Sequence, residues 1–208
     1  MADLFTIPVL LGIFYSAIRL ATPYLYAALG ETFAQRSGVL NLGTEGMMLM
    51  GAYAGFFVGM TTGNLWLGVL AAAVAGGLMG LLMAVISVTL KAEQGISGIG
   101  LALFGLGLSS LLFKKTLGSV ISITGFQPIR IPLLADIPVV GELLFNHNVL
   151  VYGAFLLVPI SAWLLNRTTF GLKVRAVGQN PQAADTLGVN VDQIRYTTVI
   201  LGGMLAGI

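Results

Sequence analysis

The sequence contains no cysteine, one histidine and very few charged residues. Ten of its 208 residues are Lys or Arg and eight are Asp or Glu, so 9% are charged, whereas soluble domains carry about 25%. The absence of cysteine excludes disulfides, thiolate metal sites and cysteine nucleophiles. A net charge of +2 is far from the basic patch of a nucleic-acid-binding module. These shortages argue against a cytosolic enzyme, a disordered tail and a partner that is a nucleic acid.

Long apolar runs take the place of the missing charges. Hydrophobic residues make up 57% of the chain and mean hydropathy is +0.95. A spanning helix needs about 20 mostly apolar residues, and six runs approach or reach this: 4–30, 41–60, 65–90, 94–113, 148–165 and 196–208. We therefore predict an all-α, polytopic transmembrane helical bundle with about six spans, forming one permease-like domain over 1–208.

Two of these runs are irregular. The first contains Arg19 and Pro23, so we expect a kinked span or a span followed by a re-entrant piece. The last has 13 residues, too short to cross, and we expect further C-terminal spans to be missing from this sequence.

The positions of Lys and Arg predict the orientation, because cytoplasmic loops carry more of them. The loops near Arg36, near Lys91 and within 167–195 hold six, and the opposite loops hold three. This difference places the N-terminus outside the cell. It makes 166–193 a cytoplasmic loop and 116–147 an extracytoplasmic segment, which we expect to lie at the interface as short helices broken by prolines.

Glycines recur at helical spacing in two of the apolar runs. Gly51, Gly55 and Gly59 are four residues apart, as are Gly76 and Gly80. Such spacing lets two helix backbones approach closely in lipid. We predict that these five glycines are helix-packing contacts.

A short polar group stands at the start of the second run. Asn41, Thr44 and Glu45 lie at the mouth of an otherwise apolar helix, with Gly43 and Gly46 beside the carboxylate. A carboxylate at membrane depth is costly unless it is paired, hydrated or at a helix N-terminus. We interpret Asn41, Thr44 and Glu45 as a pathway or gating element; the alternative is a first-turn carboxylate favoured by the helix dipole.

The longest polar interval precedes the last run and contains the signals of a short helix. Asn180 can cap it, Pro181 suits its first position and Gly188 can end it. The small Ala183 and Ala184 would let the helix sit flush in a groove. Because so short a helix is unstable alone, we expect it to dock on another surface; the alternative is a solvated loop with one turn.

Catalytic motifs are weak. No phosphate-binding G-x-x-x-x-G-K-[ST] is present, so ATP cannot be hydrolysed by a P-loop of this chain. His147 lies at a span boundary, where we expect it to cap a helix. The G-x-S-G around Ser97 matches intramembrane serine proteases, but no histidine lies within a span to act as base. We therefore predict no catalytic residues, no metal site and no cofactor.

Three segments together resemble one family of permeases. They are AQRSGVLNLGTEGMMLMGA at 34–52, IPVVGELLF at 137–145 and RAVGQNPQAAD at 175–185. They are similar to the membrane subunits of ABC importers that serve branched-chain amino acids, ribose-type sugars and nucleosides, and resemble the nucleoside-type branch most.

The resemblance implies a transport subunit of an ATP-driven importer in a bacterial-type inner membrane, without catalysis of its own. Its implied partners are a cytoplasmic ABC ATPase that uses the ATP, a second homologous permease subunit, an extracytoplasmic substrate-binding lipoprotein and a small polar solute. It assigns ATPase coupling to ten positions: Gly171, Lys173, Arg175, Gly178, Asn180, Pro181, Ala183, Ala184, Asp185 and Gly188.

Other functions stay open at this point. Nucleosides are the expected substrate, with simple sugars or branched-chain amino acids as alternatives. An ATP-independent carrier that uses Glu45 as a proton or cation site, and an intramembrane protease, are hypotheses from other classes.

Overall fold

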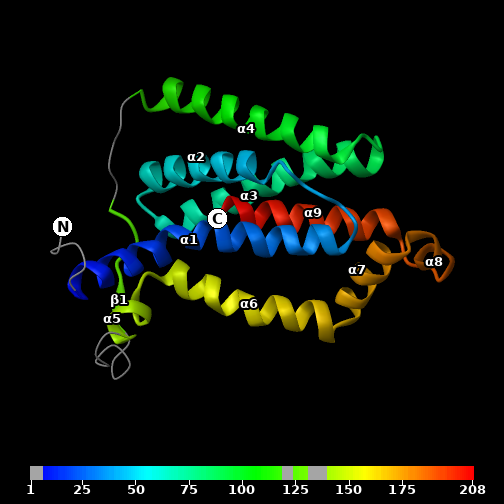
Figure 1. Ribbon diagram of the computed structural model, residues 1–208. Helices are drawn as coiled ribbons and strands as arrows, with labels where there is room; N and C mark the ends of the chain where they lie inside the picture. Colours follow the sequence, from blue (N-terminus) through cyan, green and yellow to red (C-terminus); the bar gives the residue numbers. More distant parts are fainter. Residues whose placement is uncertain (1–6, 119–123, 131–139) are drawn as a thin grey trace.

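The computed structural model describes residues 7–118, 124–130 and 140–208, and it is a bundle of long helices (Figure 1). The long helices are α1 (Ile7–Arg36), α2 (Thr44–Thr62), α3 (Leu65–Ala84), α4 (Gln94–Thr116), α6 (Val149–Arg167) and α9 (Val191–Gly207). Helices α1, α4, α6 and α3 with its extension are long and apolar enough to cross a membrane. The all-α membrane bundle predicted from the apolar runs is confirmed.

Short elements connect these helices at the two ends of the bundle. They are η2 (Val85–Thr89), a π-helical turn that extends α3, then β1 (Ile129–Arg130), α5 (Val140–Leu144), β2 (Asn146–His147), α7 (Thr169–Gln179) and α8 (Pro181–Thr186). Figure 1 shows α7 and α8 at one end and β1 with α5 at the other. The bundle thus has a connecting structure of short elements at each end.

Helix α9 lies in the middle and contacts α1, α2 and α3. Glycine makes these contacts close. A Cβ added at Gly30, Gly51 or Gly76 would collide with the backbone of α9 at Gly202, Gly207 or Gly203 respectively. Since lipid is as apolar as the helices, such backbone contact is a main source of helix association in membranes.

The other predicted packing glycines lie at neighbouring contacts. Gly55 faces Gly68 on α3, and a Cβ at Gly68 would lie 2.7 Å from the Gly55 carbonyl oxygen. The same Cβ would lie 3.4 Å from the Cα of Gly59, and a Cβ at Gly80 would lie 2.8 Å from the carbonyl oxygen of Val199. All five glycines singled out by spacing therefore lie against another helix.

Helix α1 runs from Ile7 to Arg36 through Pro23, so the alternative of a span followed by a re-entrant piece is wrong, and the kinked span stays a prediction. Proline removes one backbone N–H, which leaves the carbonyl of Arg19 without its usual partner four residues on. The neighbouring Thr22 hydroxyl donates a hydrogen bond of 2.9 Å to the Ile18 carbonyl, one turn earlier.

The prediction of short, proline-broken helices over 116–147 lies partly outside the described residues. The described part of this segment contains α5 and a pair of antiparallel two-residue strands, in which Ile129 stands opposite His147. Pro132 and Pro138 lie outside the described residues. Because pairing of two-residue strands depends on distant segments, no local pattern indicated it.

His147 does not cap α6, but its ring lies against a carbonyl in the last turn of α5. The cap of α6 is Asn148, which accepts a hydrogen bond from the Val151 backbone N–H. The His147 ring is buried, stacks on Tyr15 at 4.6 Å between ring centroids and lies 2.7 Å from the Leu143 carbonyl oxygen. It joins the β1–α5 end to α1.

Candidate substrate path and docking end

The linker between α1 and α2 turns back along the bundle. Helix α2 therefore begins inside the bundle, short of the end at which α1 stops and α4 starts (Figure 1). Gly46 lies against Leu101 of α4, seven residues after Gln94 begins that helix. At 1.5 Å per residue this is a depth of about 10 Å. The linker is thus a re-entrant segment that brings polar groups into the bundle.

Three hydrogen bonds hold the linker. The Leu40 N–H donates to Gln94 Oε1 at 2.8 Å, and the Asn41 N–H donates to Glu31 Oε1 at 3.0 Å. The buried Asn41 side chain accepts from the Gly43 N–H at 2.9 Å. Asn41 therefore shapes the turn before α2.

Glu31 of α1 is a carboxylate that the sequence analysis did not select. Its Oε1 also accepts from Gln35 at 3.0 Å, while Oε2 is buried and has no hydrogen-bond partner among the described residues. Glu31 follows directly after the predicted span 4–30 and falls inside a membrane-length helix only in the structure, where an ionisable residue marks a functional site by default.

Thr44 and Glu45 lie together in the first turn of α2 and line a cavity of about 600 Å³. Its remaining wall comes from α1, α2 and α9: Pro23, Tyr24, Ala27, Met48, Leu49, Ala52, Ala206, Gly207 and Ile208. Glu45 is exposed and is the acidic residue of the first turn of α2, where the helix dipole favours a negative charge. The structure thus brings Thr44 and Glu45 together on an open face, while Asn41 lies behind them in the turn.

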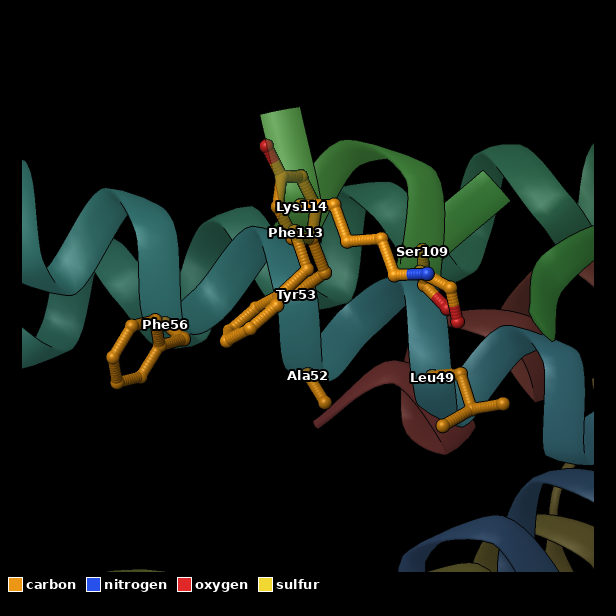
Figure 2. A pocket seen from close by; sticks show the side chains of 8 residues that line it. Leu49, Ala52, Tyr53, Phe56, Ser109, Phe113 and Lys114 are labelled. Atoms are coloured by element: carbon orange, nitrogen blue, oxygen red, sulfur yellow. The ribbon is translucent and has the colours of Figure 1, made fainter. Parts of the chain in front are cut away.

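A second pocket, of about 400 Å³, continues this face between α2 and α4. Leu49 and Ala52 border both cavities. Figure 2 shows aromatic and polar side chains from both helices around the second one. The open face of α2 is therefore lined from Glu45 at the deep end of the linker to Phe56, three turns further along.

The second candidate region is the polar end of the bundle, which α7 and α8 form. Asn180 caps α8, accepting from the Ala183 N–H at 3.0 Å, Pro181 stands at its first position, and Gly188 has a φ of +80°. The short helix predicted from these residues is present. Its Ala184 is buried against the chain itself whereas Ala183 is exposed, so only Ala183 of the two is available to a partner.

The outer surface of this end has one apolar side chain that the sequence analysis did not single out. Leu187, directly after α8, is 84% exposed. Beside it a hollow of about 580 Å³ is bordered by Asp185 and Asp192. Lys173 is exposed, and Arg175 is half-buried with an Nε that has no hydrogen-bond partner among the described residues.

The α7–α8 end is joined to the linker by direct backbone contact. A Cβ added at Gly178 of α7 would collide with the carbonyl group of Arg36, the last residue of α1. Gly38, with a φ of +84°, lies beside Gly178 and Arg195. Gly171, at the start of α7, lies equally close to the carbonyl of Leu165 in α6. A displacement of α7 would therefore reach the linker.

The protease hypothesis gains no support from the geometry. Ser97 Oγ donates to the Glu93 carbonyl oxygen at 2.6 Å, within its own helix turn. His147 belongs to the β1–α5 end, away from the start of α4 (Figure 1). Within the described ranges, no group of three His, Cys, Asp or Glu side chains is placed to hold a metal ion.

The sequence of this chain is similar to those of known membrane transport proteins. The family described as "Branched-chain amino acid transport system / permease component" matches residues 13–208. A Haloferax volcanii protein named as a glucose ABC transporter permease is 42% identical over 94% of this chain and 60% of its own length. The guanosine ABC transporter permease protein of Bacillus subtilis and the nucleoside ABC transporter permease protein of Lactococcus lactis are each 36% identical, over 90% of this chain and 62% of theirs.

The chain thus spans about 60% of the length of the curated relatives it matches. No solved structure matches it. The match over nearly all of its residues agrees with the resemblance drawn from the segments 34–52, 137–145 and 175–185. The chain belongs to the family of branched-chain amino acid transport system permease components.

Proposed function

We propose that this chain is the membrane-spanning part of a permease subunit of an ATP-driven ABC importer for nucleosides. The supporting observation is that the α7–α8 end and an open, lined face of α2 lie at opposite ends of one re-entrant linker. Substrate passes along the face of α2 that begins at Thr44 and Glu45, while a separate ATPase acts on α8. Two of the relatives are named as permeases for guanosine or nucleosides.

Six basic residues support a cytoplasmic orientation of the α7–α8 end. Arg36, Lys91 and those within 167–195 lie at one end of the bundle, and Lys114, Lys115 and Arg130 at the other. The more basic end is cytoplasmic by the rule for membrane proteins. The N-terminus and the β1–α5 end then face an extracytoplasmic binding protein, and a second permease subunit completes the path.

Coupling begins at Leu187 and Ala183. A large apolar side chain that is 84% exposed outside the membrane is typical of an anchor that a partner covers. Asp185 and Asp192 form the acidic edge beside it. ATP binds to and is hydrolysed by the partner, so this chain needs no cofactor.

The test is ATP-driven uptake by the full-length permease, its ATPase and its binding protein in proteoliposomes. Labelled guanosine should accumulate with ATP inside, and excess nucleoside should compete better than glucose or leucine. Leu187→Ser and Ala183→Glu should abolish uptake while capture by the binding protein stays intact. Thr61→Ala, at an exposed position near the end of α2 and away from α8, serves as the control. Uptake that needs a proton gradient instead of ATP would establish the carrier hypothesis with Glu45 as its proton site.

Simple-sugar import is a second candidate function. It is favoured by the relative at 42% identity that is named for glucose. Glucose competing against guanosine at equal concentration decides between the two.

A further inference from the structure

Helices α2 and α4 close on each other at one end and part at the other (Figure 1). At the closed end two glycines are in backbone contact, since a Cβ at Gly105 would lie 2.5 Å from the Gly46 carbonyl oxygen. A Cβ at Gly98 would likewise lie 2.7 Å from the Leu42 nitrogen. The wedge between the helices opens away from α7 and α8, toward the end to which the binding protein would deliver substrate.

Aromatic rings line this wedge where it widens. Tyr53 and Phe56 come from α2 and Phe113 from α4 (Figure 2). All three are half-buried, so each keeps part of its surface open to the pocket. Tyr53 is held in place by a hydrogen bond of 3.2 Å between its hydroxyl and that of Thr116. Flat aromatic surfaces on both walls of a cavity favour a flat ligand.

Polar groups stand on the α4 wall of the same pocket. Ser109 donates its proton to the Leu106 carbonyl oxygen at 3.1 Å, so its oxygen remains available as an acceptor for a ligand hydroxyl. Ser110 and Lys114 are exposed along the wall. Figure 2 shows Lys114 reaching along the wall to Ser109, and an ammonium there suits a ligand that carries hydrogen-bond acceptors.

We propose that the wedge between α2 and α4 binds the base of a purine nucleoside that carries a 6-oxo group. The proposal rests on the proposed importer function and names the substrate class of its path. The base lies against Phe56 and Phe113, and Lys114 donates to O6 and N7, the acceptor pair that Lys and Arg recognise in guanine. The ribose hydroxyls meet Ser109 and Ser110. A volume of about 400 Å³ falls within the usual size of small-molecule sites, about 300–1,000 Å³.

Adjacent lysines provide a matched pair of variants. Lys114 borders the pocket and Lys115 does not, although both are exposed at the end of α4. In uptake by the complete transporter, Lys114→Met should raise the KM for guanosine and inosine about tenfold, the value of one specific contact to a base edge. It should raise the KM for adenosine less, since adenine keeps the N7 acceptor but presents an amino group in place of O6. Lys115→Met should change neither.

The rings are tested in the same way. Phe113→Leu should raise the KM for guanosine about tenfold through the loss of one stacked ring. Phe104→Leu, the same substitution on α4 at a side chain that is 50% exposed and outside the pocket, is the control. Phe113→Tyr keeps a ring and should retain most of the affinity.

A photoreactive azidoguanosine on the purified full-length complex gives a readout that does not depend on transport. The label should appear on peptides containing residues 49–56 or 109–114 and should be displaced by inosine. The site is overturned if the complex imports nucleosides while Lys114→Met and Phe113→Leu keep the original KM, which would leave Lys114 as a lysine that only reaches the lipid headgroups. Absence of ATP-driven nucleoside uptake overturns the proposed function, whereas displacement of the label by glucose and not by inosine overturns the ligand class.

Discussion

Thr198 on α9 donates a hydrogen bond of 2.8 Å to the hydroxyl of Ser37, and both side chains are fully buried. Ser37 in turn donates to the Ala34 carbonyl oxygen at 2.8 Å. The Arg195 Nε donates to the Ser37 carbonyl oxygen at 3.4 Å. The first residue of the re-entrant linker is therefore held by the helix that follows the α7–α8 end.

Replacing Thr198 with valine should weaken this junction. Valine has the same shape but cannot donate, so the bond to Ser37 is lost at a cost of about 1 kcal/mol in the free energy of unfolding. Thr198→Ser is no control, because it removes a buried methyl group at a similar cost. Thermal unfolding of the detergent-solubilised protein in a double-mutant cycle of Thr198→Val with Ser37→Ala isolates the bond, and additive losses of stability would contradict the assigned hydrogen bond.

Gly178→Ala should uncouple ATP hydrolysis from transport. The added Cβ collides with the Arg36 carbonyl, so α7 has to move away from the end of α1. We expect uptake to fall at least tenfold, with substantial ATPase activity retained by the complex. Gly107→Ala, where the Cβ meets nothing within 4 Å, is the control. Retention of full uptake in Gly178→Ala would show that the α7–α1 contact does not carry the coupling.

Glu31 should be replaceable by glutamine but not by alanine. The amide oxygen of glutamine can accept the Asn41 N–H that Glu31 Oε1 accepts at 3.0 Å. Alanine leaves that N–H unpaired, at a cost of about 1–3 kcal/mol. Hydrogen exchange at the Asn41 amide is the direct measurement. It should become faster in Glu31→Ala and stay slow in Glu31→Gln; a slow amide in both would remove Glu31 from its role in holding the linker.

Glu93 should make a small contribution to stability that depends on pH. The pKa of its carboxyl is lowered because the backbone N–H groups of Ile96 and Gly95 donate hydrogen bonds to it at the start of α4. A lowered pKa means that the folded state favours the ionised form. The stabilisation is present above the ordinary value of 4.5 and is lost as the pH falls through the lower pKa of the folded state.

Other carboxylates titrate in the same range, so a difference measurement isolates Glu93. The gap in Tm between the original protein and Glu93→Gln should be largest near pH 7 and should close below about pH 4.5. A gap that stays constant down to pH 3 would show that the charge of Glu93 has no part in capping α4.

Gly76→Ala should disrupt the centre of the bundle. Its Cβ collides with the backbone of Gly203 and lies 2.8 Å from the Cα of Gly207, so α3 and α9 have to separate. We expect a loss of several kcal/mol, as for overpacked cores, seen as aggregation in detergent. Gly100→Ala, on α4 with nothing within 4 Å, should behave like the original protein. If the Gly76→Ala protein stayed monodisperse in detergent, α3 and α9 would have to be packed less closely than the structure shows.

The apolar runs predicted the long helices because a span in lipid needs length and apolar composition, and both are local properties. The capping residues Asn180, Pro181 and Gly188 predicted α8 for the same reason. The effect of Pro23 could not be predicted in this way, because whether a proline ends a membrane helix depends on the helices packed around it.

The candidate site was less accessible from sequence. Apolar side chains cover every side of these helices, so periodicity does not separate a face toward lipid from a face toward protein. Thr44 and Glu45 stood out as polar residues, but the pocket around Phe113 depends on how α2 and α4 diverge. Leu187 could not be identified as a candidate partner contact from the sequence, because an apolar residue indicates such a contact only when it is known to be exposed.

The central position of α9 has a consequence for biosynthesis. Helices α1 to α3 are synthesised on the order of 100 residues before α9, which at about 5–20 residues per second is a delay of roughly 5–20 s. During that time the glycine-lined sides of α1, α2 and α3 lack the helix they pack against. The inserted helices must therefore wait in the bilayer for α9. If a chaperone or lipid covers their exposed glycine surfaces during this interval, its supply would limit how much permease is assembled.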